Sequence, residues 1–138
     1  MRSVKGALFI VLSFYLAACA GKPSRVTSEV NEKYKTFVAK QSYEPVDRIT
    51  SFRFYSWSYL SEDYIILSTT MSKPHLIEFK TPCYDLRFSH KIKVNNTGSS
   101  LNANFDSIKI LNSAFPSCYI KAIYPLTKEQ AKELENLE

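Results

Sequence analysis

The side chains with the most distinctive chemistry in this chain of 138 residues belong to three cysteines, Cys19, Cys83 and Cys118. A cysteine thiol can carry a lipid, form a disulfide or bind a metal ion, and the surrounding sequence indicates which of these it does. Cys19 directly follows an apolar segment, whereas Cys83 and Cys118 lie in the second half of the chain. Cys19 and the later pair therefore point to different chemistry.

The segment before Cys19 is typical of an export signal. Residues 1–5 carry two cations and no acid, residues 6–16 are apolar apart from one serine, and the small pair Ala17-Ala18 follows. The apolar run stops short of the about 20 residues that a membrane-spanning helix needs. We therefore predict that residues 1–18 are a signal peptide.

Leu16-Ala17-Ala18-Cys19 resembles the lipobox of bacterial lipoproteins. This resemblance implies a diacylglycerol on the Cys19 thiol, cleavage before Cys19 and acylation of the new amine, with palmitate as a typical acyl group. Two or more acyl chains hold a protein firmly on a membrane. Ala20, rather than an Asp, follows the cysteine, which implies transfer to the outer membrane, facing the periplasm. The alternative is a secreted protein that is cut near Ala18 or Ala20.

Cys83 and Cys118 are expected to form a disulfide. Two cysteines that remain in an exported chain usually pair. The alternatives are two free thiols or a metal site, but a structural zinc site needs four ligands and only His75 and His90 could be added, without a short ligand spacing. We therefore expect neither a metal ion nor another cofactor.

Length and charge favour one small domain that does not bind nucleic acid. Removal of the first 18 of 138 residues leaves 120, the size of a single domain. The full chain has 18 cations and 13 acids, and Arg2 and Lys5 are lost with the signal, so the mature chain has 16 cations and a net charge of +3. These charges form no cluster of the kind that nucleic-acid binding requires.

A stretch of alternating side chains is the most plausible ligand face. Arg53, Tyr55, Trp57 and Tyr59 would share one face of a strand, and such a face could stack on sugar rings of peptidoglycan or lipopolysaccharide. The favoured interpretation is that Trp57 anchors the core while the tyrosines pack with their hydroxyls at the rim.

No residue pattern predicts catalysis. Asp63, Asp85 and Asp106 are isolated carboxylates, and an Asp near a turn usually accepts hydrogen bonds from backbone amides. His75 and His90 have no nucleophile motif nearby, and no zinc-protease, serine-hydrolase or phosphate-loop motif is present. We therefore expect a protein that is not an enzyme.

The mature chain is expected to be mainly β, with about six strands in an antiparallel meander, sandwich or small barrel. Residues 19–45 are interpreted as a lipidated N-terminus and tether, in which a short helix is an option, and residues 46–138 as one domain. Segments rich in β-branched and aromatic residues predict the strands at 49–59, 64–68, 75–79, 91–94, 105–111 and 118–124. Thr127 and Gln130 have the spacing of a capping box, which predicts a C-terminal helix.

The ordered part of the chain resembles a family of small envelope proteins of Gram-negative bacteria whose function is not established. The resemblance covers about residues 49–132 and places His75 where a tyrosine is expected. The matching positions are Ile49, Phe52, Trp57, Tyr64–Leu67, Leu76-Ile77, Pro82-Cys83-x-x-Leu86, Ile92, Phe105-Asp106-x-Ile108 and Cys118-x-Ile120-x-x-Ile123. The resemblance implies a single domain with the Cys83–Cys118 disulfide, and it implies no reaction.

These patterns predict a lipid-anchored component of the cell envelope that binds a ligand or assists another protein. Its partners would be the membrane, through the anchor, and an envelope protein or glycan. One alternative is an inhibitor or sensor that docks on a periplasmic protein such as a cell-wall hydrolase, with the loop at Asn95–Ser100 as the docking element. Another is an enzyme that acts on glycans.

Overall fold

The computed structural model describes residues 25–137, so Cys19 and the predicted signal peptide lie outside the described part of the chain. The described part contains two α-helices, eight strands and a 3-10 helix. Their bounds, in chain order, are α1 Arg25–Lys40, β1 Arg48–Ile49, β2 Ser56–Tyr59, β3 Tyr64–Ser68, β4 Pro74–Phe79, η1 Leu86–Phe88, β5 Ile92–Asn95, β6 Leu101–Asn102, β7 Ser107–Ile110, β8 Cys118–Pro125 and α2 Lys128–Glu135.

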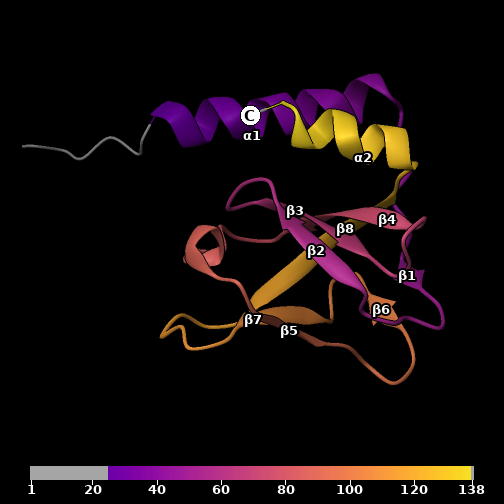
Figure 1. Ribbon diagram of the computed structural model, residues 1–138, viewed down its shortest axis with the longest axis vertical. Helices are drawn as coiled ribbons and strands as arrows, with labels where there is room; N and C mark the ends of the chain where they lie inside the picture. The colour runs from indigo at the N-terminus through magenta and orange to yellow at the C-terminus, as the bar shows by residue number, and fades with distance from the viewer. Residues whose placement is uncertain (1–24, 138) are drawn as a thin grey trace, which may run out of the picture.

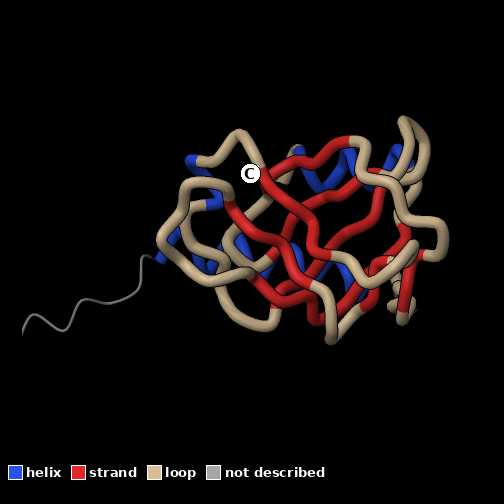
Figure 2. The backbone as a smooth tube through the Cα atoms, turned by 90° about the horizontal axis from the view of Figure 1, so that it is seen from below, coloured by secondary structure: helices blue, strands red, loops and turns tan. Residues whose placement is uncertain are grey.

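Six strands form one antiparallel sheet in the order β2-β3-β4-β8-β7-β5, and the short β1 and β6 pair separately. The sheet curls into a half-barrel, with both helices above it in Figure 1 and behind it in Figure 2. The β4–β8 register shifts between Glu78 and Phe79, and such a bulge increases the bend of a strand. The prediction of a mainly β fold with a C-terminal helix is confirmed.

The middle of the sheet is buried on both faces because the helices cover one face and the curl encloses the other, whereas β5 and β7 expose Lys93 and Lys109 on their outer face. Strand β3 shows this most clearly: Ile65 and Leu67 belong to the cluster inside the curl, whereas Tyr64 and Ile66 belong to the cluster beneath the helices. Strands that are buried on both faces have continuous apolar sequences, as this one does.

The interpretation of residues 19–45 as a tether is wrong for their described part. Residues 25–40 form helix α1, and its apolar side chains pack on the sheet. Tyr34 is 0 % exposed and Phe37 is 7 % exposed, while Val30 and Val38 pack beside them. This apolar stripe is narrow, but each large side chain removes much surface from water.

Polar contacts fix the position of α1. The Tyr34 hydroxyl donates to the Leu60 carbonyl at 3.4 Å, and the Lys33 ammonium donates to the Leu137 carbonyl at 3.2 Å. The Asn31 amide donates a hydrogen bond to Asp63, and burial raises the pKa of this carboxyl above its usual value. The helix is therefore part of the folded domain.

Helix α2 begins with the predicted capping box. The Gln130 amide nitrogen donates to the Thr127 hydroxyl, and the Thr127 amide nitrogen donates to the Gln130 side chain at 2.7 Å. Ala131 and Leu134 are buried beside α1. Neither of the two described helices has the length and apolar character needed to cross a membrane.

Candidate functional site

A hollow of about 400 Å³ at one end of the sheet combines positive charge with hydroxyl groups. It lies where strand β1, the β3–β4 hairpin and the end of β8 meet. The residues that line it are Val46, Arg48, Ile49, Thr50, Ser51, Arg53, Thr69, Thr70, Lys73, His75 and Pro125. No acid is among these lining residues, so the site suits an anion.

Three cations in the lining have no acidic partner in residues 25–137. Arg48, Arg53 and Lys73 are exposed, and the ion pairs found in the described part of the chain, Lys35–Glu32 and Lys121–Glu78, involve none of them. Guanidinium groups bind carboxylates and phosphates with two parallel hydrogen bonds, whereas an ammonium acts as a compact charge. Together the three side chains can neutralise an anionic group.

Short turns bring these cations to one place. Ser51 has a φ of 51°, in the left-handed region, so the chain reverses after β1 and Arg53 returns toward the hollow. In the β3–β4 hairpin the Thr69 amide donates to the Lys73 carbonyl at 3.1 Å, and the Thr69 hydroxyl donates to the same carbonyl at 3.4 Å. The hairpin therefore presents Lys73 from a fixed backbone.

His75 lies at the start of β4 and adds a neutral polar atom to the hollow. Burial lowers the pKa of His75 below its usual value, although backbone hydrogen bonds with Leu67 and Lys73 act in the opposite direction, so the imidazole is uncharged at neutral pH. Its Nδ1 atom is buried and has no hydrogen-bond partner among the described residues. A buried polar atom without a partner costs free energy.

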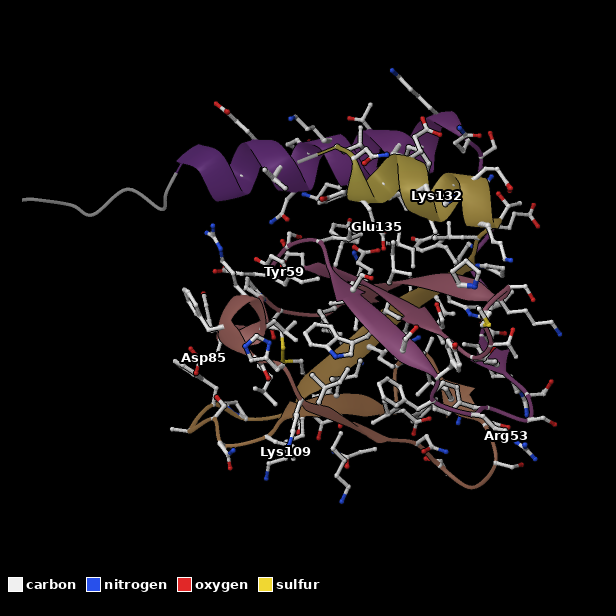
Figure 3. All side chains as sticks on the ribbon, in the orientation of Figure 1. Arg53, Tyr59, Asp85, Lys109, Lys132 and Glu135 are labelled. Atoms are coloured by element: carbon white, nitrogen blue, oxygen red, sulfur yellow. A yellow bond between two sulfur atoms is a disulfide. The ribbon has the colours of Figure 1, made fainter. Side chains whose placement is uncertain are left out.

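The four residues of the predicted ligand face do not act together. Trp57 and Tyr59 are half-buried and pack against the cluster inside the curl, as the core-anchor interpretation of Trp57 expects. Arg53 and Tyr55 precede β2 and are exposed, and only Arg53 reaches the hollow. Figure 3 shows Arg53 and Tyr59 on opposite sides of the molecule. The alternation prediction was wrong because β2 begins only at Ser56.

The isolated acids have structural partners. Asp106 is 3 % exposed, and it accepts hydrogen bonds from the Thr97 hydroxyl and the Asn102 amide nitrogen, each at 2.6 Å. Asp85 accepts a hydrogen bond from the Ser113 hydroxyl at 3.0 Å. Both carboxylates thus hold loops in place, and Asp63 contacts α1 as described above.

A second polar cluster surrounds Glu78 on β4. Its carboxylate accepts hydrogen bonds from Lys121 at 2.6 Å and from the Tyr124 hydroxyl at 3.3 Å. Burial, followed by the nearby Glu78 charge, raises the pKa of Tyr64 well above its usual value and also raises the pKa of Tyr124. These tyrosines stay protonated and act as hydrogen-bond donors at neutral pH.

The predicted disulfide joins Cys83 and Cys118, with a Cα–Cα distance of 5.6 Å. Within residues 25–137, no group of three or more His, Cys, Asp or Glu side chains is placed to hold a metal ion. His90 lines a different hollow from the one that His75 lines.

A family model described as a family of unknown function (DUF6491) matches residues 1–138. The chain belongs to this family. No curated protein and no solved structure matches the chain. The family assignment confirms the predicted relationship to proteins of unknown function.

The basic hollow of this DUF6491 protein was not found from the sequence. Its cations come from three separate segments, so their spacing forms no motif. One signal was present: the β3–β4 turn, Thr69-Thr70-Met71-Ser72-Lys73, is hydroxyl-rich and ends in a cation. Arg53 was identified from the sequence as a candidate ligand-binding residue, but it was grouped with Tyr55, Trp57 and Tyr59 instead of with Arg48 and Lys73.

Proposed function

We propose that this chain is a lipid-anchored, non-enzymatic binding protein on the periplasmic side of the outer membrane, and that its ligand carries a phosphate or carboxylate group. The observation that carries the ligand class is the hollow with Arg48, Arg53 and Lys73, in which the described residues place no acid. His75 lines the same hollow as a neutral imidazole.

The size and rim of the hollow favour a small anionic sugar over a bare ion. A volume of about 400 Å³ lies within the range of pockets that take small molecules. Hydroxyl groups of Thr50, Ser51 and Thr70 can pair with sugar hydroxyls, while the cations pair with the charged substituent. Phosphorylated lipopolysaccharide sugars and the carboxylated sugars of peptidoglycan both have this chemistry.

Titration of the purified protein with glucose 1-phosphate, N-acetylmuramic acid and neutral glucose tests this proposal. We expect calorimetry to show saturable binding of at least one anionic sugar and none of glucose. Replacing Arg53 with alanine should weaken that binding about 10- to 100-fold, since a hydrogen bond to a charged group contributes about 1.5–3 kcal/mol.

Lys109→Ala is the matched control, because it removes one exposed cation from β7, outside the hollow. This variant should bind as the parent does. Equal losses in Arg53→Ala and Lys109→Ala would show nonspecific charge attraction. If neither anionic sugar binds, the small-ligand proposal is wrong, and the docking of an acidic protein surface becomes the preferred alternative.

The proposed anchor rests on the Leu16-Ala17-Ala18-Cys19 sequence behind a basic and apolar leader. Cys19→Ser removes the thiol that would receive the diacylglycerol. We expect loss of acyl labelling, a change in electrophoretic mobility and release from washed outer membranes, since the acyl chains supply the attachment. Retained label with unchanged mobility would contradict lipidation at this residue.

A further inference from the structure

The end of the molecule that carries the disulfide exposes several large apolar side chains. Phe88 is 81 % exposed, Tyr84 50 %, Phe115 48 % and Leu111 41 %. Single exposed apolar residues need no explanation, but a group of them usually marks a contact surface. These four residues are called the aromatic end below.

The aromatic end is preformed. The Cys83–Cys118 disulfide ties the loop that holds Tyr84 to the segment that holds Phe115, and the two rings lie 5.7 Å apart. The Ser113 hydroxyl donates to Asp85 across the same two loops. Phe88 and Leu111 border a hollow of about 460 Å³. A rigid apolar surface loses little entropy when it is covered.

Cations surround this end. Arg87 and Lys91 are exposed beside Phe88, whereas the nearby acid Asp85 is hydrogen-bonded to Ser113. On the adjoining strands, the exposed Lys93 of β5 is the register partner of the exposed Lys109 of β7. Like charges that lie directly opposite are unfavourable in a sheet, and an external anionic surface would relieve that repulsion.

The aromatic end lies on the side of the molecule where α1 begins. Figures 1 and 2 show the first turn of α1 at the left, and Figure 3 shows Asp85, the neighbour of Tyr84, on that same side. Arg53 of the basic hollow is on the opposite side in Figure 3. The Cα atoms of Cys19 and Arg25 are six residues apart, and such a segment spans at most about 20 Å.

We propose that the aromatic end is a membrane-contact surface that lies on an anionic phospholipid bilayer. This inference rests on the proposed lipid anchor at Cys19, which would hold the start of α1 close to the bilayer. Tyrosine and phenylalanine side chains beside lysine and arginine match the interface between lipid headgroups and acyl chains. In this orientation the basic hollow faces away from the membrane, toward soluble or wall-bound ligands.

The charge of the aromatic end indicates that a bilayer, rather than a second copy of this chain, covers it. The cations Arg87, Lys91, Lys93 and Lys109 would repel the same set on a symmetric partner, whereas they attract anionic lipid headgroups. A membrane also explains why exposed aromatic and basic side chains lie together at the aromatic end.

A single fluorescent label reports directly on the contact. In the lipidated chain Cys19 is acylated and Cys83 is bonded to Cys118, so Ala114→Cys adds one free thiol between Leu111 and Phe115. The labelled full-length protein is reconstituted in vesicles of phosphatidylethanolamine and phosphatidylglycerol, with an environment-sensitive nitrobenzoxadiazole dye. The control is Met71→Cys, an exposed position on the hairpin beside the basic hollow.

We expect the label at residue 114 to shift to the blue, to brighten several-fold and to be quenched by spin-labelled lipids, while the label at residue 71 stays in water. Phe88→Ser with Phe115→Ser should abolish the shift at residue 114 without releasing the lipidated protein. If the labels at residues 114 and 71 both report an aqueous environment, the proposal is wrong. A shift that depends on protein concentration without vesicles would overturn it in favour of a second copy.

Failure of the anchor gives a different result. If mass spectrometry finds no lipid on Cys19, the labels are placed in a chain that also carries Cys19→Ser, so that residue 114 or residue 71 again holds the single free thiol, and the same vesicles are added by titration. A blue shift at residue 114 alone then supports the membrane-contact surface although the anchor is wrong. The absence of a shift overturns the surface as well.

Discussion

Replacing Tyr34 with alanine is expected to lower the free energy of unfolding by about 3–5 kcal/mol, the range for truncation of large buried aromatic side chains. Tyr34 is 0 % exposed and stands at the centre of the contact between α1 and the sheet. Its ring lies 5.7 Å from that of Tyr64, and its hydroxyl contacts the Leu60 carbonyl. Alanine would leave a cavity beneath the helix and remove these contacts.

Denaturant unfolding of the full chain, followed by tryptophan fluorescence and by circular dichroism, measures this loss. Tyr34→Phe keeps the ring and should cost only about 1 kcal/mol, the contribution of one hydrogen bond. Thr36→Ala is the control on an exposed position of the same helix, and it should leave the midpoint nearly unchanged. If Tyr34→Ala also leaves the midpoint unchanged, α1 is only loosely attached and the interpretation as a tether is restored.

The strands could be predicted because their sequences carry two kinds of local information. The alternation at Lys91-Ile92-Lys93-Val94 predicted a half-buried strand, and Ile92 and Val94 pack against the core while Lys93 is exposed. The compact apolar run from Tyr64 predicted a strand, and its first four residues are buried. Thr127 and Gln130 marked the start of α2 because the capping box depends on residues close together in the chain.

Helix α1 could not be recognised as part of the core because its apolar stripe is meaningful only beside the sheet. Val30, Tyr34, Phe37 and Val38 have helical spacing, but most other residues of the segment are polar. Helices of this length gain most of their stability from tertiary packing rather than from their own propensity. The curl of the sheet and the position of β8 create the surface that α1 covers, and neither can be derived from local sequence.

The candidate site escaped prediction for a related reason. Arg48, Arg53 and Lys73 are brought together by a positive φ at Ser51 and by the β3–β4 hairpin, so their proximity depends on backbone turns. The face predicted from Arg53 to Tyr59 assumed one continuous strand, whereas only Ser56–Tyr59 pairs regularly with β3. Alternation predicts a shared face only where the strand is uninterrupted.

Removal of the disulfide is expected to lower the free energy of unfolding by about 4 kcal/mol. Cys83 and Cys118 are 35 positions apart, and closure of a loop of that length restricts the unfolded chain by about this amount in the chain-entropy model. Both cysteines are buried in the cluster inside the curl, at 0 % and 7 % exposure, so Cys83→Ala with Cys118→Ala keeps apolar side chains there. The loss should bring a small domain near the limit of stability.

Two measurements separate the bond itself from the packing of the sulfur atoms. The unfolding midpoint of the parent protein should fall when a reductant is added, and that of the double alanine variant should not change. The reduced parent and the variant should then have similar stabilities, with the variant lower by the cost of the lost sulfur contacts. The bond also joins the two loops of the aromatic end, so its loss should loosen the Tyr84–Phe115 contact before the sheet unfolds. A parent protein whose midpoint is indifferent to reductant would show that the two cysteines stabilise the fold only as buried apolar side chains.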